Sequence, residues 1–258
     1  MNPLRAFFRP NAWRVFRRNL LAWKTFAWSS ITINIVEPIV YFVAFGYGFG
    51  AYFSFGGHGS LLQYLGPGML ALTAVNAATF DAAWGGYERL TTNGVYESMV
   101  TAPVEPEEIA AGEYLWQAFR ATLYGAIFLG VIAALGLVHS WLALLCLPVL
   151  ALTGVLFAIP ALYVAFIVKT PEHLFYYFAL LVTPLVMFAG VFFPLDRLPR
   201  WTQDVAWATP LYHAVIACRS LIAGTPTIGT LEEVGWLAVA IVLVVWLPQR
   251  VLRRRLSG

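Results

Sequence analysis

The chain has 258 residues, of which 60% are hydrophobic and only 11% are charged, and its formal net charge is +3. Soluble globular proteins contain about 25% charged residues, so this composition excludes an ordinary soluble enzyme, a disordered chain and a nucleic-acid-binding protein. It predicts an all-α polytopic membrane protein, with residues 1–258 forming a single transmembrane domain.

Six apolar runs are long enough to cross a membrane. A helix rises about 1.5 Å per residue and needs about 20 mostly apolar residues to cross about 30 Å of hydrocarbon. The runs that meet this requirement are residues 27–50, 61–84, 109–138, 141–168, 174–193 and 231–247. Only His139 and Ser140 separate the third run from the fourth, which predicts a tight helical hairpin. We therefore expect six transmembrane helices.

Basic residues are concentrated on one side of the expected membrane helices. Those before the first run and after the last are Arg5, Arg9, Arg14, Arg17, Arg18, Lys24, Arg250, Arg253, Arg254 and Arg255. Arg89 and Lys169 lie in loops on the same side, whereas the opposite side carries Arg197, Arg200 and Arg219. Because Lys and Arg gather in cytoplasmic segments, both termini are predicted to be cytoplasmic.

The segment before the first run is amphipathic. Residues at intervals of three and four form one helical stripe: Trp13, Phe16, Leu20, Trp23 and Ala27. Arg14, Arg17, Arg18 and Lys24 lie off this stripe. The pattern predicts an amphipathic N-terminal helix that lies in the membrane interface. The alternative is a basic anchor that only sets the topology.

Residues 85–108 form the longest predicted cytoplasmic loop. The loop is acidic, with carboxylates at Glu88, Glu97, Glu105, Glu107 and Glu108. Asn93-Gly94 and Pro103 interrupt the chain on either side of residues 95–101. This short segment can form a helix that carries Tyr96, Met99 and Val100 on one face.

Residues 190–224 are predicted to lie outside, yet they remain rich in apolar side chains. Pro194, Pro199 and Pro210 divide the region into pieces that are too short to span a membrane. Non-helical backbone at membrane depth is tolerated only where protein or a water-filled cavity covers it. We therefore expect short re-entrant helices between the fifth and sixth spans.

Charged residues at membrane depth are the remaining candidates: Glu37 in the first predicted span, Asp81 near the inner end of the second and Arg120 in the third. Charged groups are costly at this depth. One explanation is that they line a translocation path. The other is structural, with Asp81 or Glu113 pairing with Arg120 and Glu37 meeting a neighbouring helix.

Aromatic residues crowd the outer half of the first span and its exit. The candidates for a translocation path are Tyr41, Phe45, Tyr47 and Phe49. An interfacial aromatic belt explains such crowding, and so does a lining on which sugar rings stack. The sequence leaves both explanations open.

Motifs for nucleotide or metal chemistry are missing from the sequence. The chain has no Gly-x-x-x-x-Gly-Lys-Ser/Thr segment, since its only lysines are Lys24 and Lys169. The four histidines are scattered without metal-ligand spacing: His58, His139, His173 and His213. We therefore expect no catalytic residue, no metal site and no cofactor bound by this chain.

Several segments together resemble the permeases of ABC-2 type exporters. They are Pro210-Leu211-Tyr212-His213 with Arg219, residues 188–195 with Leu198-Pro199, Glu37-Pro38 with residues 44–50, and Tyr87-Glu88-Arg89 with residues 101–104. The chain looks most like the nodulation-type lipooligosaccharide export permeases. That closer likeness rests on Tyr96-Glu97-Ser98-Met99 and Leu152-Thr153-Gly154.

The resemblance implies a six-helix half-transporter of the bacterial inner membrane that dimerises and binds a separate ATPase subunit, which holds ATP and Mg²⁺. It implies that the interface helix and the short loop helix contact the ATPase, with Tyr96, Glu97, Met99 and Val100 as coupling contacts. The acidic loop would then meet basic residues of that partner. Pro210, His213 and Arg219 would belong to an exit gate.

The function that the resemblance implies is outward export of an amphiphilic glycoconjugate similar to a lipooligosaccharide. A drug or lipid efflux permease of the same superfamily is the nearest alternative. A polytopic membrane enzyme would need clustered His, Asp or Ser at one membrane face, which the sequence does not offer. An ion-coupled transporter would have a polar site near the midplane, for which Glu37-Pro38 is the only support.

Overall fold

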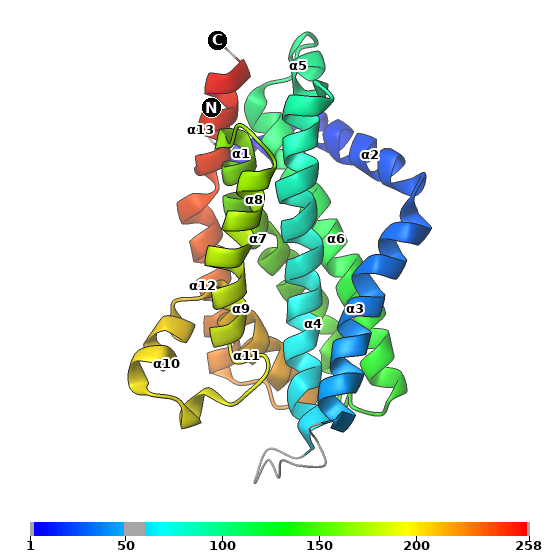
Figure 1. Cartoon of the computed structure of the whole chain (residues 1–258), viewed down its shortest axis with the longest axis vertical. Coiled ribbons are helices and arrows are strands. Elements are labelled where there is room, and N and C mark those ends of the chain that lie inside the picture. Colours follow the sequence, from blue (N-terminus) through cyan, green and yellow to red (C-terminus); the bar gives the residue numbers. More distant parts are fainter. Residues whose placement is uncertain (1–2, 49–59, 257–258) are drawn as a thin grey trace.

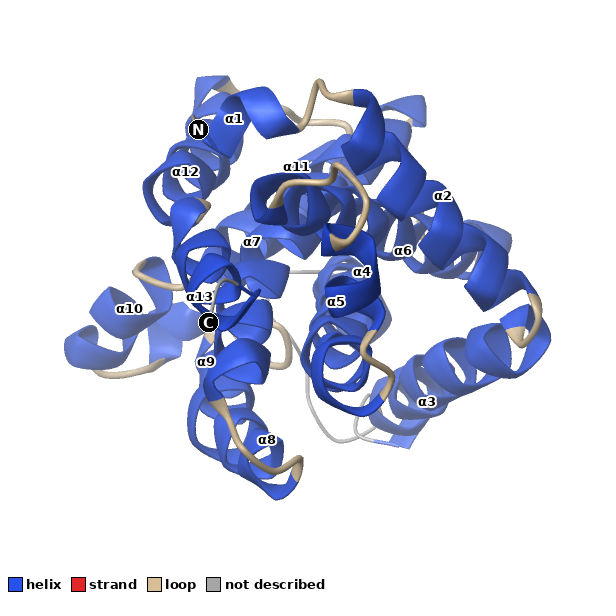
Figure 2. Cartoon of the chain, turned by 90° about the horizontal axis from the view of Figure 1, so that it is seen from above, coloured by secondary structure: helices blue, strands red, loops and turns tan. Residues whose placement is uncertain are grey.

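The computed structural model describes residues 3–48 and 60–256, and within these residues every regular element is a helix (Figures 1 and 2). The α-helices are α1 (Pro3–Ala6), α2 (Pro10–Lys24), α3 (Ala27–Gly48), α4 (Leu61–Phe80), α5 (Val95–Val100), α6 (Pro106–Ala134), α7 (Cys146–Ile167), α8 (Glu172–Tyr177), α9 (Thr183–Phe188), α10 (Arg200–Trp207), α11 (Pro210–Ala223), α12 (Ile228–Val244) and α13 (Trp246–Leu256). The all-helical prediction is confirmed for this part of the chain.

The core lies where α4, α6 and α7 pack against one another. α4 is buried along most of its length and contributes small side chains such as Ala71, Ala74 and Ala78 to the core. Small residues let helices approach closely, which is how membrane helices gain packing contacts. Figure 1 shows α1, α5 and α13 at one end of the bundle and α10 and α11 at the other.

Within residues 3–48 and 60–256, four helices are long and apolar enough to cross a membrane: Ala27–Gly48, Pro106–Ala134, Trp141–Ile167 and Ile228–Leu256. The count is five if the bent pair α10 and α11, at 87°, is taken as one span. The predicted run 61–84 contains α4, which lies in the centre of the bundle. The predicted run 174–193 contains Glu172–Phe188, a shorter apolar helix. The part of the chain that the structure describes therefore has four to five candidate spans, as in a multi-helix membrane protein.

Two predicted boundaries were wrong. α6 ends at Ala134, so the turn between the third and fourth spans is longer than His139 and Ser140. Gly136 adopts φ +72°, a left-handed conformation that terminates helices and that glycine reaches without strain. Residues 85–92 were expected in a loop, but the helix continues beyond α4 through two π-helical turns, Asp81–Gly85 and Glu88–Thr92.

The amphipathic segment forms α2, as predicted, and part of its apolar face packs against α6. Phe16 and Trp23 of α2 pack against Trp116 and Phe119 of α6, whereas Trp13 is 60% exposed. Most of the predicted stripe therefore contacts protein. In Figure 2, α2 runs along α6 at the edge of the bundle.

Candidate coupling and translocation site

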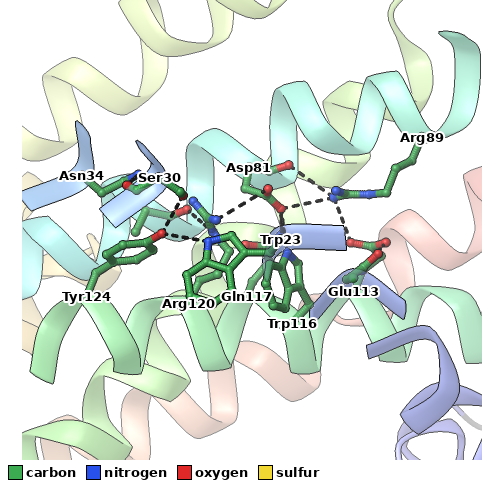
Figure 3. Close-up of polar contacts among 12 residues, drawn as sticks. Trp23, Ser30, Asn34, Asp81, Arg89, Glu113, Trp116, Gln117, Arg120 and Tyr124 are labelled. Carbon is green, nitrogen blue, oxygen red and sulfur yellow. Dashed lines mark hydrogen bonds and ion pairs between the residues drawn. The ribbon is translucent and has the colours of Figure 1, made fainter. Parts of the chain in front are cut away.

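A buried polar network occupies the α5 end of the bundle (Figure 3). We use this name for Asp81, Arg89, Glu113, Trp116, Gln117 and Arg120. Asp81 Oδ2 accepts hydrogen bonds from Gln117 Nε2 at 2.7 Å and from Trp116 Nε1 at 3.0 Å. Its Oδ1 lies 3.9 Å from Arg120 Nη1. Asp81 and Arg120 therefore pair with each other, as the structural alternative predicted.

Arg89 is the residue that joins the two acids of the network. Its Nη2 donates to Glu113 Oε2 at 3.0 Å and to Asp81 Oδ2 at 3.3 Å, and its Nε donates to the Tyr96 hydroxyl at 3.2 Å. Glu113 was expected to pair with Arg120 as an alternative to Asp81, but it pairs with Arg89. The two acids and two arginines balance in charge, which is the condition under which ionic groups are tolerated in a buried site.

The surroundings keep the Arg89 guanidinium charged and the Tyr96 hydroxyl neutral. Burial raises the pKa of the Tyr96 hydroxyl, and the neighbouring Glu113 carboxylate raises it further, so this hydroxyl stays neutral. Burial alone would lower the pKa of the Arg89 guanidinium, but Glu113, Tyr96 and Asp81 more than offset it and raise that pKa. The contact is therefore a charge-assisted hydrogen bond.

The network continues into α2 and α3. Asn19 of α2 donates to Glu113 Oε1 at 2.9 Å, and Trp23 Nε1 donates to the Tyr124 hydroxyl at 3.2 Å. The Tyr124 and Ser30 hydroxyls share a hydrogen bond of 2.6 Å. Side chains of α2, α3, α6 and the π-helical turn after α4 thus meet in this region, most of them drawn in Figure 3.

α5 matches the predicted short helix, and its residues divide between two environments. Tyr96 is fully buried and packs edge-on against Phe166 of α7, so it faces the bundle's own core. Met99 and Val100 are half-buried, whereas Glu97 is exposed. Of the four predicted coupling contacts, Glu97 lies most openly at the surface. Tyr96 instead holds α5 in place.

The acidic loop is largely neutralised within the chain. Glu105 and Glu108 pair with Arg9 at 3.1 and 3.5 Å, and Glu107 pairs with Arg253 of α13 at 2.6 Å. These contacts join α13 and the residue that precedes α2 to the start of α6. Within residues 3–48 and 60–256, Glu88 and Glu97 are the loop carboxylates that remain exposed without an ion pair.

The path candidates on α3 do not share one environment. Glu37, Tyr41 and Phe45 recur every four residues and so lie along one flank of α3. The Tyr41 and Phe45 rings are 6.2 Å apart, and Phe45 lies 5.7 Å from Phe192 in the segment after α9. Glu37 is exposed in the isolated chain. Tyr47 is 62% exposed and lies about 200° around the axis of α3 from Phe45, so it is on a different face of the helix. Phe49 lies outside the described residues.

His213 and Pro210 organise the helices at the opposite end. Pro210 occupies the first turn of α11, and the Thr209 side chain caps that helix by accepting from Tyr212 N. His213 Nε2 donates to the Trp207 carbonyl oxygen of α10 at 2.7 Å, and its Nδ1 lies against the Glu233 carboxylate of α12. The imidazole stacks on Trp236 at 4.0 Å. His213 thus connects α10, α11 and α12.

Arg219 lines a cavity of about 230 Å³, which we call the α11 cavity. Its walls are Tyr64, Ala189, Gly190, Pro194, Leu195, Asp196, Tyr212, Ile216 and Arg219. The Arg219 guanidinium stacks 4.2 Å from the Tyr64 ring centre, and its Nη2 donates to the Gly190 carbonyl oxygen at 3.2 Å. The Tyr64 hydroxyl donates to that same oxygen at 3.0 Å.

The comparisons with known proteins now bear on this arrangement. Residues 10–223 match the family model described as ABC-2 type transporter. The chain belongs to the ABC-2 type transporter family. It is therefore an exporter permease of the ATP-binding-cassette class and a multi-pass protein of the bacterial inner membrane.

Curated relatives agree with this assignment. The permease is 35% identical to Nodulation protein J of Rhizobium leguminosarum bv. trifolii over 94% of this chain and 92% of that protein. It is 34% identical to Nodulation protein J of Rhizobium meliloti (strain 1021) over 95% of both. Inner membrane transport permease YadH of Escherichia coli (strain K12) is 26% identical over 83% of this chain and 86% of that protein.

Several residues of the permease site were missed from sequence. Arg89 had been placed in a loop, so its return to Asp81 and Glu113 was not expected. One signal was available: Glu113, Gln117 and Arg120 recur at intervals of four and three on an otherwise apolar helix, which marks one polar face. Asn19 gave no comparable signal, because its partner Glu113 lies 94 residues away. Glu233 gave none either, because its partner His213 lies on a different helix, α11.

Proposed function

We propose that this permease works with a separate ABC ATPase subunit to export an amphiphilic glycoconjugate, similar to a lipooligosaccharide, across the bacterial cytoplasmic membrane. The ATPase subunit would bind ATP and Mg²⁺, and this chain would supply the path. The likeness to nodulation proteins J over most of each chain supports the substrate class.

The observation that carries the partnership is the arrangement of α5. This short helix stands at one end of the bundle with Glu97 exposed, while Tyr96 ties it to Arg89 inside. A partner that moves α5 would therefore act on the buried polar network. Coupling contacts at Glu97, Met99 and Val100 are part of this proposal, with Tyr96 as the internal anchor.

The proposed topology has six spans, with both termini cytoplasmic. α4 has 20 residues, which at about 1.5 Å per residue reaches across about 30 Å of hydrocarbon. Glu172–Phe188 would be the fifth span. The bent pair α10 and α11 would then be re-entrant, and Pro210, His213 and Arg219 would belong to an exit gate. An even number of spans agrees with α1 and α13 at the same end in Figure 1.

A homodimer is proposed because α3 leaves a charged flank uncovered. Glu37 is exposed near the middle of α3, next to exposed Val36 and Val40. A carboxylate at this depth in lipid is costly, so a second permease or a water-containing path has to cover it. Asn76 and Phe80 are also exposed on α4, most of whose other residues are buried. A path between two copies would be lined by Glu37, Tyr41 and Phe45.

The test uses inside-out vesicles that contain the permease co-expressed with an ABC ATPase from the same genome. One probe is a fluorescent N-acylated chitin oligosaccharide, and the matched control is a fluorescent phospholipid with the same acyl chain. ATP-dependent accumulation of the glycolipid alone is the expected result. Equal accumulation of both probes favours the lipid efflux alternative. Accumulation driven by an ion gradient without ATP contradicts the proposal.

A further inference from the structure

The Arg89 guanidinium occupies space that Gly85, one helical turn earlier, leaves free because it has no side chain. A Cβ atom built at Gly85 would lie 2.8 Å from Arg89 Nη1 and 3.2 Å from Nη2. The guanidinium therefore rests directly on the backbone of Gly85. Any larger residue at this position would displace it, while the arginine itself would keep its charge.

From its position over Gly85 the Arg89 guanidinium contacts three separate elements. It contacts Asp81 at the end of α4, Glu113 of α6 and Tyr96 of α5 at 3.3, 3.0 and 3.2 Å. Tyr96 and Glu113 are fully buried, so water cannot replace the contacts at their side chains. Separating Arg89 from these partners would leave buried charges unpaired, which is strongly unfavourable.

The backbone between α4 and α5 is unusual in the same region. Gly85 ends one π-helical turn and Arg89 lies in the next. π-Helical turns are rare, occur mostly as single turns within α-helices and are frequent at functional sites. Each carries one residue more than an α-helical turn, so its loss or gain rotates the following helix by about 100°. Arg89 therefore spans the segment in which such a change would reorient α5.

We propose that Arg89, seated on Gly85, is the positioning residue that couples the movement of α5 to α4 and α6. The proposal rests on the proposed function, because it assumes that a partner ATPase moves α5. When Arg89 holds its contacts with Asp81, Glu113 and Tyr96, α5 moves together with α4 and α6. Without these contacts, α5 moves while α4 and α6 stay still.

The first experiment measures hydrogen exchange of the purified permease alone, so it does not depend on any partner. Arg89→Gln is expected to speed exchange of the α5 amides at least tenfold and to leave α12 unchanged. Gly85→Ala is expected to act in the same direction. Gly130→Ala is the matched control, since no heavy atom lies within 4 Å of a Cβ at that site in α6. Unchanged α5 exchange in Arg89→Gln overturns the proposal.

The second experiment compares transport with ATP consumption in vesicles that contain the ATPase subunit. Arg89→Gln is expected to keep ATPase binding and hydrolysis while the amount of probe exported per ATP falls at least tenfold. A residue that only stabilises the fold would lower binding, hydrolysis and transport together, and that result contradicts the proposal. Arg89→Lys keeps the charge but not the guanidinium fork, so we expect partial rescue.

A double variant shows whether Gly85 acts through Arg89. Gly85→Ala combined with Arg89→Gln should change α5 exchange and export per ATP no more than Arg89→Gln alone does, because both changes disrupt the same contacts of Arg89. Additive losses overturn the proposal. If Arg89→Gln does not fold, Gly85→Ala and Arg89→Lys give the same two readouts. A wild-type permease that binds no ATPase contradicts the proposed function, and the hydrogen-exchange result still decides whether Arg89 holds α5.

Discussion

At the α5 end, Asp81, Arg89, Glu113 and Arg120 contact one another, whereas at the α11 end Arg219 and Tyr64 contact a backbone carbonyl beside a cavity. The first arrangement cross-links helices through charged side chains that cannot separate without cost. The second fixes a short non-helical segment and leaves about 230 Å³ unfilled next to it. The α5 end is therefore cross-linked as the proposed coupling requires, and the α11 end has an unfilled cavity beside its fixed segment.

The largest effect on stability is expected when an acid of the network is removed. Asp81→Leu leaves Arg89 and Arg120 short of a buried partner, which should lower the free energy of unfolding by about 3–5 kcal/mol. Thermal unfolding in nanodiscs measures this loss. Glu88→Leu, an exposed acid on the neighbouring turn, is the control and should change stability by less than about 0.5 kcal/mol. Equal effects of the two variants would show that the network does not cross-link the helices.

A smaller effect is expected at the α11 end. Arg219→Gln removes the stacking on Tyr64 and the hydrogen bond to Gly190, and should cost about 1–3 kcal/mol. Because these contacts fix the segment before α10, limited proteolysis within residues 189–199 should become faster. Arg200→Gln, at an exposed arginine of α10, is the matched control. Unchanged proteolysis in Arg219→Gln would contradict this account of the α11 end.

The ion pair between Glu107 and Arg253 should contribute less, because the Arg253 side chain is 54% exposed. Arg253→Gln is expected to cost about 1 kcal/mol or less. The exchanged pair Glu107→Arg with Arg253→Glu should recover part of the stability that Glu107→Arg alone loses, as measured by thermal unfolding. If the exchanged pair is less stable than Glu107→Arg alone, the two side chains do not act on each other.

The smallest effect on stability is expected at Glu97, which has a surface role in the proposed function. Glu97→Lys should shift unfolding by less than about 0.5 kcal/mol. Because it reverses a charge on α5, it should weaken ATPase binding about tenfold or more, measured by titration in detergent. Ser29→Lys, at an exposed position near the start of α3, should leave binding unchanged. ATPase binding that is unaffected by Glu97→Lys would remove this residue from the coupling surface.

Much of the fold was predictable because lipid limits the choices. Apolar runs of about 20 residues have to form helices there, since their backbone groups find no water to bond. This requirement located α3, α6, α7 and α12 within a few residues. It located α4 as well, although α4 is buried among other helices and is less apolar than those that face lipid. The ends of helices were predicted less well, because glycine conformation and π-helical turns leave little trace in hydropathy.

The site was predictable only in part. Asp81 and Arg120 stood out because charge is rare in apolar runs, and Tyr96 and Glu97 stood out through the short helix between chain breaks. The residues with which they interact could not be predicted in this way. Arg89 meets Glu113 across 24 residues, and Asn19 meets Glu113 across 94.

The sequence by itself determined that this chain is a helical membrane protein, where its apolar helices begin to within a few residues, and which charges need an explanation. Hydrophobicity and helical periodicity are local properties, so they can be read along the chain. Only the tertiary structure decided that Tyr96 faces inward, that the acidic loop is neutralised by α2 and α13, and that Arg89 rests on Gly85. These outcomes depend on which distant residues share a buried volume, and local patterns do not specify that.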